Sequence, residues 1–343
     1  MMASEMTEPI TNHSERLGRL PVFPFFVGCG RSGTTLVRAI FSSHPELVIP
    51  PESHFLGRMV EHENAYNSPT GFSTDRFLSD LYARPWLSRW ELEEEIVKQA
   101  IRSNPPTDLP DAVRLVFSLY AQMSGKPRYG DKTPRYVLYL PQLANLFPEA
   151  RFVHIIRDGR DVTLSLLEKD WGANNVIEGA LFWKQRVEAG REAGRSLGPD
   201  RYREIRYERL MDDPEDIVRS VCEFIELPFD PVMLRYYERP RDEVFRGGVR
   251  PGTRKRDGRL RLPPTKGLRD WRRQMSKPDI AAFEIVVGDL LQELGYQRGI
   301  DRLPASARLK ARFRVLRHKS QFAVRRFVRR VRFKFGLRLK PTE

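Results

Sequence analysis

The stretch that decides the fold is Gly28-Cys29-Gly30-Arg31-Ser32-Gly33-Thr34-Thr35. An apolar run over residues 21–27 precedes it and is typical of a buried strand, and residues 36–41 follow it with the pattern of a helix. A glycine-rich loop between a strand and a helix points backbone N–H groups at the positive end of the helix dipole. The stretch therefore predicts a site for a phosphate or a similar anion, although the same glycines would also suit a simple tight turn.

The loop is close in spacing to the Walker A pattern, G-x4-G-K-[ST], but Thr34 stands where the lysine belongs. The positive charge lies three residues earlier, at Arg31. A nucleoside triphosphate site uses that lysine on the terminal phosphates and holds Mg²⁺ with the following hydroxyl. The displaced cation favours a different anion that is bound without a metal.

Composition and cysteine content suit a globular cytoplasmic protein. The chain has 343 residues, of which 40% are hydrophobic, so it can bury a sizeable core. Its two cysteines, Cys29 and Cys222, offer neither a disulfide framework nor metal-ligand spacing. Residues 1–18 lack the pattern of a signal peptide, and no apolar run has the ~18 residues that a membrane-spanning helix needs. We therefore expect a cytoplasmic location.

The net charge of +14 is concentrated at one end of the chain. Residues 302–343 contain 15 Lys and Arg and a single acidic residue, Glu343, so residues 1–301 are balanced in charge. Apolar residues recur in this tail at helical spacing, namely Leu309, Phe313, Leu316, Ala323, Phe327, Val331 and Phe335. The pattern predicts a basic amphipathic helix or pair of helices.

Strand and helix patterns alternate along most of the chain. Strands are predicted over residues 22–27, 128–130, 151–156 and 202–207, and helices over 33–43, 134–147, 160–168, 176–195, 214–226 and 279–294. This order predicts an α/β fold, with a P-loop-like parallel sheet flanked by helices and followed by the C-terminal helical tail. We expect a disordered N-terminus over 1–20, one domain over 21–300 and the tail over 301–343.

Several motifs together carry a family resemblance. They are Gly30 to Leu36, His44-Pro45-Glu46, Pro51-Glu52-Ser53, Asp131-Lys132-Thr133-Pro134, Arg157-Asp158-Gly159-Arg160-Asp161-Val162 and Arg206 to Leu210. In this order they make the chain resemble sulfotransferases that use 3′-phosphoadenosine 5′-phosphosulfate (PAPS). The resemblance is nearest to the tyrosylprotein sulfotransferases and related bacterial sulfotransferases. It covers about residues 25–229.

The resemblance implies a set of donor-binding residues. The 5′-phosphosulfate loop matches Arg31, Ser32, Gly33, Thr34 and Thr35. The site for the 3′-phosphate matches Arg157, where a predicted strand ends, and Ser165 on the next helix, and Tyr207 matches a residue that lines the nucleotide pocket. The end of a parallel strand is where ligands bind in open α/β sheets, which agrees with the position of Arg157.

The resemblance also implies the catalytic residues. Glu52 matches the general base that takes the acceptor's proton, with His54 as the competing candidate, because the cytosolic enzymes use a histidine. Lys132 matches a lysine that contacts the transferring group, and Arg31 stabilises the leaving phosphate. The expected reaction moves a sulfuryl group from PAPS to a hydroxyl acceptor such as a carbohydrate, a glycolipid, a tyrosyl peptide or a small alcohol, with no metal.

One departure from the cytosolic enzymes concerns the Arg-Lys-Gly motif that clasps their 3′-phosphate. Residues 254–256, Arg-Lys-Arg, and 265–267, Thr-Lys-Gly, both resemble it in part, within an unpatterned stretch over 240–267 that we expect to act as a lid. Two other functions stay open from the residues alone. One is a P-loop kinase that uses ATP and Mg²⁺, and the other is a non-catalytic anion- or nucleic-acid-binding protein.

The basic tail has three interpretations. Its helix could lie on an anionic membrane, on the inner face of the cell membrane if the protein is cytoplasmic. It could bind nucleic acid through phosphates, which the lack of any base-reading module disfavours. It could also pack its apolar residues on the body of the same protein. We expect the membrane surface.

Overall fold

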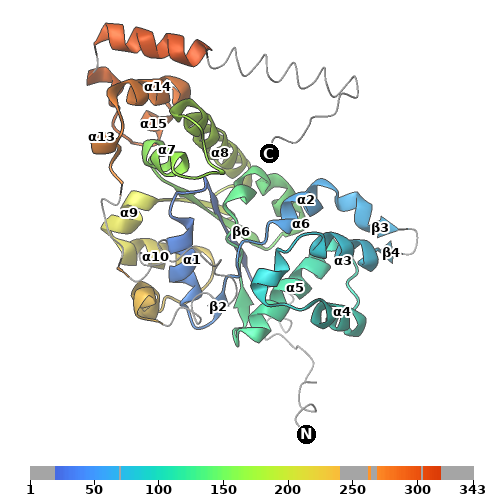
Figure 1. The fold of residues 1–343 in the computed structure, drawn as a ribbon. Helices are drawn as coiled ribbons and strands as arrows, with labels where there is room; N and C mark the ends of the chain where they lie inside the picture. The colour runs from blue at the N-terminus through green and yellow to red at the C-terminus, as the bar shows by residue number, and fades with distance from the viewer. Residues whose placement is uncertain (1–19, 69–70, 240–261, 264–268, 303, 318–343) are drawn as a thin grey trace, which may run out of the picture. The chain divides into compact units, whose positions relative to one another are not determined.

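The computed structural model describes residues 20–68, 71–239, 262–263, 269–302 and 304–317. The chain divides into two compact units, and Figure 1 shows their elements. The first unit comprises residues 1–28, 33–156 and 189–266, and the second comprises 29–32, 157–188 and 267–343. Among the described residues, no helix is long and apolar enough to cross a membrane.

A parallel sheet forms the centre of the first unit. Its strands are β1 (Phe23–Gly28), β6 (Ala150–Ile156) and β7 (Tyr202–Arg206), in the order β1-β6-β7. Phe25 pairs with Phe152, which in turn pairs with Tyr202. On the other side of β1, Phe25 forms a parallel bridge with Asp131. Asp131 follows shortly after the short strand β5 (Arg128–Tyr129). This strand pairs in parallel with another short strand, β2 (Leu47–Val48).

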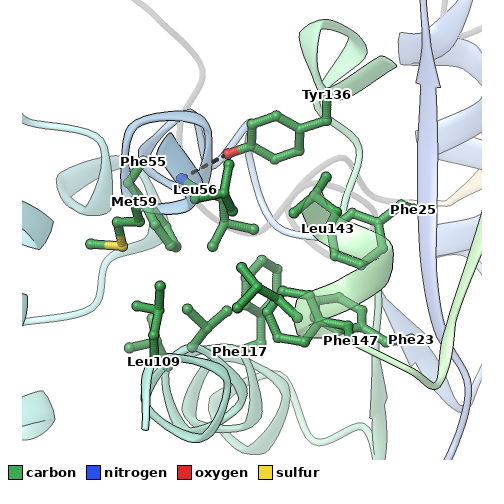
Figure 2. Packing of buried hydrophobic residues seen from close by; sticks show 14 of the residues in the cluster. Phe23, Phe25, Phe55, Leu56, Met59, Leu109, Phe117, Tyr136, Leu143 and Phe147 are labelled. Atoms are coloured by element: carbon green, nitrogen blue, oxygen red, sulfur yellow. Dashed lines mark hydrogen bonds between the residues drawn. The ribbon is translucent and has the colours of Figure 1, made fainter. Parts of the chain in front are cut away.

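Strands β1 and β6 are buried on both faces, which explains why they are apolar at nearly every position, whereas β7 is only partly buried and mostly polar. Phe23 and Phe25 face one core, which Figure 2 shows packed against residues of the helices α2, α5 and α6. Phe26 and Val153 face the opposite core, together with residues of α1 and α10. Alternation of side chains along a strand assigns neighbouring residues to opposite cores.

The helices of the first unit are α1 (Thr34–Ser42), α2 (Phe55–Glu61), α3 (Thr74–Tyr82), α4 (Glu94–Ser103), α5 (Leu109–Met123), α6 (Leu140–Leu146), α9 (Tyr207–Asp212) and α10 (Pro214–Phe224). The predicted helices over 33–43 and 214–226 correspond to α1 and α10, whereas α2, α3, α4, α5 and α9 were not predicted individually. The prediction of one helix over 134–147 is wrong. A 3-10 helix, η4 (Pro134–Leu138), ends at Tyr139, and α6 begins after it with a proline in its first turn.

Several short elements of the first unit were not predicted from the sequence. They are 3-10 helices η2 (Glu63–Tyr66), η3 (Leu87–Trp90) and η5 (Pro231–Glu238), and the antiparallel pair β3 (Asn67–Ser68) and β4 (Gly71–Phe72). Elements this short bury few side chains and so carry no readable period.

The second unit is helical. It contains α7 (Gly159–Leu167), α13 (Trp271–Gln274), α14 (Lys277–Val287), α15 (Leu290–Glu293), the 3-10 helix η7 (Ile300–Arg302) and a helix over 305–317. Helix α8 (Val176–Leu197) begins in this unit, and its residues from Ala189 belong to the first. The single helix predicted over 279–294 is wrong, because Gly288 adopts a φ of 64° and ends α14.

Both cysteines are buried thiols. Cys29 is 1% exposed in the second unit, and Cys222 is 1% exposed in the first. Burial raises the pKa of each thiol to about 12. Both are free thiols in the structure.

Candidate active site

The loop after β1 contributes an arginine and a serine to the second unit. Arg31 adopts a left-handed φ of 79°, and its Nε donates a hydrogen bond of 2.8 Å to Ser165 Oγ on α7. Ser32 is fully buried, and its hydroxyl has no hydrogen-bond partner among the described residues. Buried hydroxyls are normally paired. An unpaired one in a glycine-rich loop suits a site that receives an anionic ligand.

Arg157 follows β6 directly and is 9% exposed. Its Nη2 lies 3.3 Å from Asp161 Oδ2 on the first turn of α7. The other oxygen of Asp161 accepts a hydrogen bond of 2.9 Å from the backbone N–H of Trp271. Asp161 thus contacts both Arg157, which belongs to the predicted 3′-phosphate site, and the backbone of Trp271.

A buried ion network lies beside Arg157. The Arg160 side chain is fully buried, donates to both oxygens of Asp158 and pairs with Glu284 of α14 at 2.7 Å. Its guanidinium lies 3.5 Å from the centroid of the Trp271 ring. Glu284 also accepts the backbone N–H groups of residues 299 and 300. The charge run around Arg160, which from sequence alone could be a solvated surface, is therefore a buried structural network.

The predicted anion-binding loop, residues 28–35, is called the anion loop below. Its residues from Gly33 onward belong to the first unit. Thr34 is 4% exposed in the first turn of α1, and Thr35 is exposed. Gly33 precedes them with a φ of 89°, and a Cβ at this position would lie 2.3 Å from the Tyr207 ring. Tyr207, at the start of α9, thus packs directly against the loop, and only glycine fits there.

Glu52 and Lys132 form an ion pair in the first unit. Glu52 Oε1 lies 2.5 Å from Lys132 Nζ, and Glu52 Oε2 lies 3.1 Å from His54 Nε2. The Lys132 side chain is 4% exposed, whereas that of Glu52 is 34% exposed. The structure therefore brings together the predicted base, its predicted competitor and the predicted lysine.

A hydrogen-bond network holds this pair in place from beneath. Ser53 Oγ donates to Asp131 Oδ2 at 2.7 Å, lies 2.7 Å from the Tyr136 hydroxyl, and its backbone N–H donates to Thr133 at 3.1 Å. Tyr136 in turn accepts from the backbone N–H of Leu56. Because Ser53 and Asp131 are the chain neighbours of Glu52 and Lys132, the network fixes both side chains in one place.

Electrostatics differ between the two carboxyl groups. Burial tends to raise the pKa of Glu52, but the Lys132 ammonium and the hydrogen bonds from His54 and Lys132 outweigh it, so this pKa lies far below its ordinary value. Burial raises the pKa of Asp131 to about 6, against the hydrogen bonds from Ser53 and Thr133. Glu52 is thus ionised at neutral pH and tightly paired.

Some residues that shape the site carry no local signal in the sequence. Arg38 of α1 is 8% exposed and donates to the backbone oxygen of Ile49 at 2.9 Å, and its charge acts on Glu52. Trp90 donates its indole N–H to the Pro51 carbonyl at 2.9 Å. Both anchor the segment before Glu52 from elements that are distant in sequence, so the motif spacing could not reveal them.

Other motif residues lie apart from this pair. His44 is 3% exposed and its Nε2 donates to the Pro228 carbonyl at 2.8 Å, so it packs at the end of α1. The lid candidates at 254–256 and 265–267 lie outside the described residues. No group of three metal-ligating side chains occurs among the described residues, and the absence of a metal stays a prediction.

The sequence matches one known protein family over most of its length. The model of the sulfotransferase family matches residues 24–231, which include both groups of site residues. This chain belongs to the sulfotransferase family.

Individual relatives agree with this assignment. The chain is 26% identical over 315 residues to the nodulation protein NoeE of Sinorhizobium fredii, covering 84% of this chain and 69% of that one. It is 23% identical over 285 residues to protein-tyrosine sulfotransferase A of Caenorhabditis elegans, covering 81% and 68%. The sulfotransferase domain of the Synechococcus PCC 7002 olefin synthase has the same fold. Its TM-score is 0.57 at 23% identity, over 83% of this chain and 97% of that domain.

The part of the chain that matches the family contains the candidate site residues. The match begins in β1 and ends in η5, so it spans the anion loop, the Glu52–Lys132 pair and the start of α7. This sulfotransferase has Thr34 where a Walker A sequence has its lysine, and the cation of its loop is Arg31. The expected α/β fold with a parallel sheet and flanking helices is confirmed.

Proposed function

We propose that this sulfotransferase moves a sulfuryl group from PAPS to a hydroxyl acceptor. The acceptor oxygen attacks sulfur while the bond from sulfur to the bridging oxygen of the 5′-phosphate breaks. The proton of the acceptor passes to Glu52, and adenosine 3′,5′-bisphosphate leaves. The observation that carries the proposal is the Glu52 carboxylate, held 2.5 Å from Lys132 and 3.1 Å from His54 in a member of this family.

The donor's 5′-phosphosulfate is assigned to residues 31–35. Negative charge grows on the bridging oxygen as the S–O bond breaks, and fixed cations and N–H groups stabilise such charge best when they are preorganised. Arg31, the unpaired hydroxyl of Ser32, the N–H groups of Gly33, Thr34 and Thr35 and the hydroxyls of Thr34 and Thr35 supply those groups. A buried hydroxyl without a partner supports this assignment.

The 3′-phosphate is assigned to Arg157 and Ser165. Ser165 is 2% exposed and already accepts a hydrogen bond from Arg31, so one hydroxyl joins the loop arginine to the helix that follows Arg157. A guanidinium binds phosphate oxygens through paired hydrogen bonds. Tyr207, packed on Gly33, is assigned to the nucleotide's pocket.

The ion pair between Glu52 and Lys132 implies an order of events. In this pair the carboxylate is a weak base, because its pKa is strongly lowered. The sulfonate of the donor is an anion that competes for the Lys132 ammonium. When Lys132 turns to the donor, the pKa of Glu52 rises, and the carboxylate becomes a better base as the reaction begins.

Tyrosyl hydroxyls are the acceptor class to test first. Relatives from Caenorhabditis elegans and Drosophila melanogaster are named protein-tyrosine sulfotransferases. A phenol has a pKa of ~10, so it gives up its proton to a carboxylate more readily than an aliphatic alcohol does. Carbohydrate and glycolipid hydroxyls are the second class.

The deciding experiment compares two nucleotides that differ in a single phosphate. We expect adenosine 3′,5′-bisphosphate to bind at least about tenfold more tightly than adenosine 5′-phosphate, and Arg157→Ala to remove most of that difference. Equal affinities would overturn the assignment of PAPS as donor and favour an ATP-dependent kinase. Transfer of label from PAPS to tyrosyl peptides, or to carbohydrates, then identifies the acceptor.

A further inference from the structure

The helix over residues 305–317 has two opposite apolar faces. Ala311 and Val315 are each 4% exposed, and Ala307 packs with Ala311 against Ala281 and Ile300 of the second unit. Near this contact, Arg314 pairs with Asp279 of α14 at 2.6 Å. The inner face of the helix is therefore docked on its own unit, through residues other than those of the predicted apolar stripe.

The outer face is apolar and open. Leu309, Phe313 and Leu316 are 55%, 64% and 65% exposed, and they are among the most exposed large apolar side chains of the described residues. At about 100° per residue, these three positions share one stripe on the side away from Ala311 and Val315. Single exposed apolar residues are common on protein surfaces, whereas three on one helical stripe indicate an interaction surface.

Basic residues border this stripe on both sides. With the same helical geometry, Arg308 and Arg312 lie along one edge, and Lys310 and Arg317 lie along the other. All four are exposed. No acidic residue occurs between Arg302 and Glu343, so the surroundings of the stripe are basic in sequence throughout.

We propose that the stripe of Leu309, Phe313 and Leu316 binds the surface of an anionic lipid bilayer. Its three apolar side chains enter the boundary between headgroups and acyl chains, and the bordering cations contact lipid phosphates. Charge complementarity selects this partner, since only an anionic and apolar surface satisfies both parts of the helix. A nucleic acid would use the cations but leave the three apolar side chains in water.

The inner face of the helix connects the lipid-binding stripe to the folded second unit. Because Ala307 and Ala311 dock the helix on the second unit, lipid binding by the outer face holds that unit directly against the bilayer. This proposal does not depend on the identity of the donor or the acceptor.

The test uses the full chain and vesicles of two compositions. We expect binding to vesicles of phosphatidylglycerol with phosphatidylcholine, and at least about tenfold weaker binding to phosphatidylcholine alone. The triple variant Leu309→Gln, Phe313→Gln, Leu316→Gln should bind the anionic vesicles at least about tenfold more weakly than the unchanged chain. Ile96→Gln changes a 39% exposed residue of α4 and should bind normally.

A second pair of variants tests the cations. Arg308→Gln with Arg312→Gln should weaken binding to anionic vesicles about tenfold or more at low salt and reduce its dependence on salt. Lys277→Gln with Arg272→Gln changes two exposed cations of the same unit and should have a smaller effect. Transfer to a soluble acceptor should stay unchanged in all of these variants.

Three results would overturn the proposal. Equal binding to neutral vesicles would remove the role of charge. Binding of duplex DNA without binding of anionic vesicles would assign the basic helix to nucleic acid. A triple variant that unfolds at lower temperature, in a protein that binds neither vesicle, would mean that the stripe is covered by another part of the chain.

Discussion

Glu52 and Lys132 each restrain the chemistry of the other. The ammonium keeps the carboxylate ionised, and the carboxylate neutralises a lysine whose side chain is only 4% exposed. Either charge would be costly to bury by itself. The pair therefore stabilises the resting site, and we propose that it separates when an anionic donor competes for the lysine.

Replacing the carboxylate tests its role as base. We expect Glu52→Gln to lower the rate of sulfuryl transfer about 10²- to 10⁴-fold, the usual contribution of a general base. Binding of adenosine 3′,5′-bisphosphate, measured by calorimetry, should change little. Glu46→Gln, at an exposed glutamate of the same segment, should leave both quantities unchanged. Loss of nucleotide binding in Glu52→Gln would instead indicate a structural role.

Replacing the lysine tests the electrostatic coupling. Lys132→Met removes the main attraction that lowers the pKa of Glu52, so burial is less opposed and this pKa rises. The acidic limb of the profile of kcat against pH should move to higher pH, and the maximal rate should fall. His54→Gln removes only a hydrogen bond to Glu52 and should move the limb less. An unmoved acidic limb in Lys132→Met would contradict the coupling.

At the scale of elements, the segment before α2 is joined to η4 through one buried carboxyl group. The pKa of Asp131 is raised to about 6, so the native state binds its proton more tightly than the unfolded chain does. The contribution of Asp131 to stability is therefore greatest below the unfolded pKa and is lost as the pH rises through about 6.

Acidification should reveal this group. Relative to Asp131→Asn, the unchanged protein should gain up to about 3 kcal/mol in free energy of unfolding as the pH falls from about 7 to about 4. Denaturant titrations at several pH values measure this difference. The exposed Asp200→Asn should follow the unchanged protein. Parallel pH curves for Asp131→Asn and the unchanged protein would contradict the raised pKa.

The turn between β1 and α1 admits only glycine at one position. Gly33→Ala places a Cβ against the Tyr207 ring at a φ of 89°, so we expect a loss of about 1–3 kcal/mol in stability and weaker nucleotide binding. Gly30→Ala is the matched control in the same loop, because no atom lies within 4 Å of its Cβ position. Thermal unfolding of the two variants distinguishes them, and equal losses would mean that the loop as a whole is sensitive.

At the scale of the whole molecule, the second unit depends on one buried arginine. Arg160→Met removes the cation that pairs with the buried carboxylate of Asp158 and leaves Glu284 with the more distant Arg298, at 3.8 Å, so we expect a loss of about 3–5 kcal/mol in stability. Arg195→Met breaks an ion pair whose arginine is 68% exposed and should cost less than about 1 kcal/mol. Denaturant unfolding measures both variants. A small effect of Arg160→Met would mean that the network relaxes or admits water.

Sequence patterns predicted the strands well because β1 and β6 are buried on both faces and read as apolar runs. They failed where one residue interrupts a longer pattern, as Tyr139 does before α6 and Gly288 does after α14. Family motifs pointed to both Glu52 and Lys132. Their direct contact joins residues 80 positions apart, which no local period encodes.

The burial of charged side chains was the property that the sequence predicted least well. The run around Arg160 is highly charged, and charged runs are usually solvated. Here Asp158 and Glu284 neutralise the arginine and Trp271 covers it, so the cation lies inside the second unit. The partners come from the residue before α7, from α14 and from the start of α13, and only the folded chain brings them together.

The two buried thiols have a practical consequence for studying this enzyme. Reagents such as maleimides attack the thiolate, which Cys29 and Cys222 scarcely form at neutral pH. A cysteine introduced on the surface, for example by Phe313→Cys, should therefore react selectively without removal of the native ones. A fluorophore attached there would report directly on the polarity around the helix.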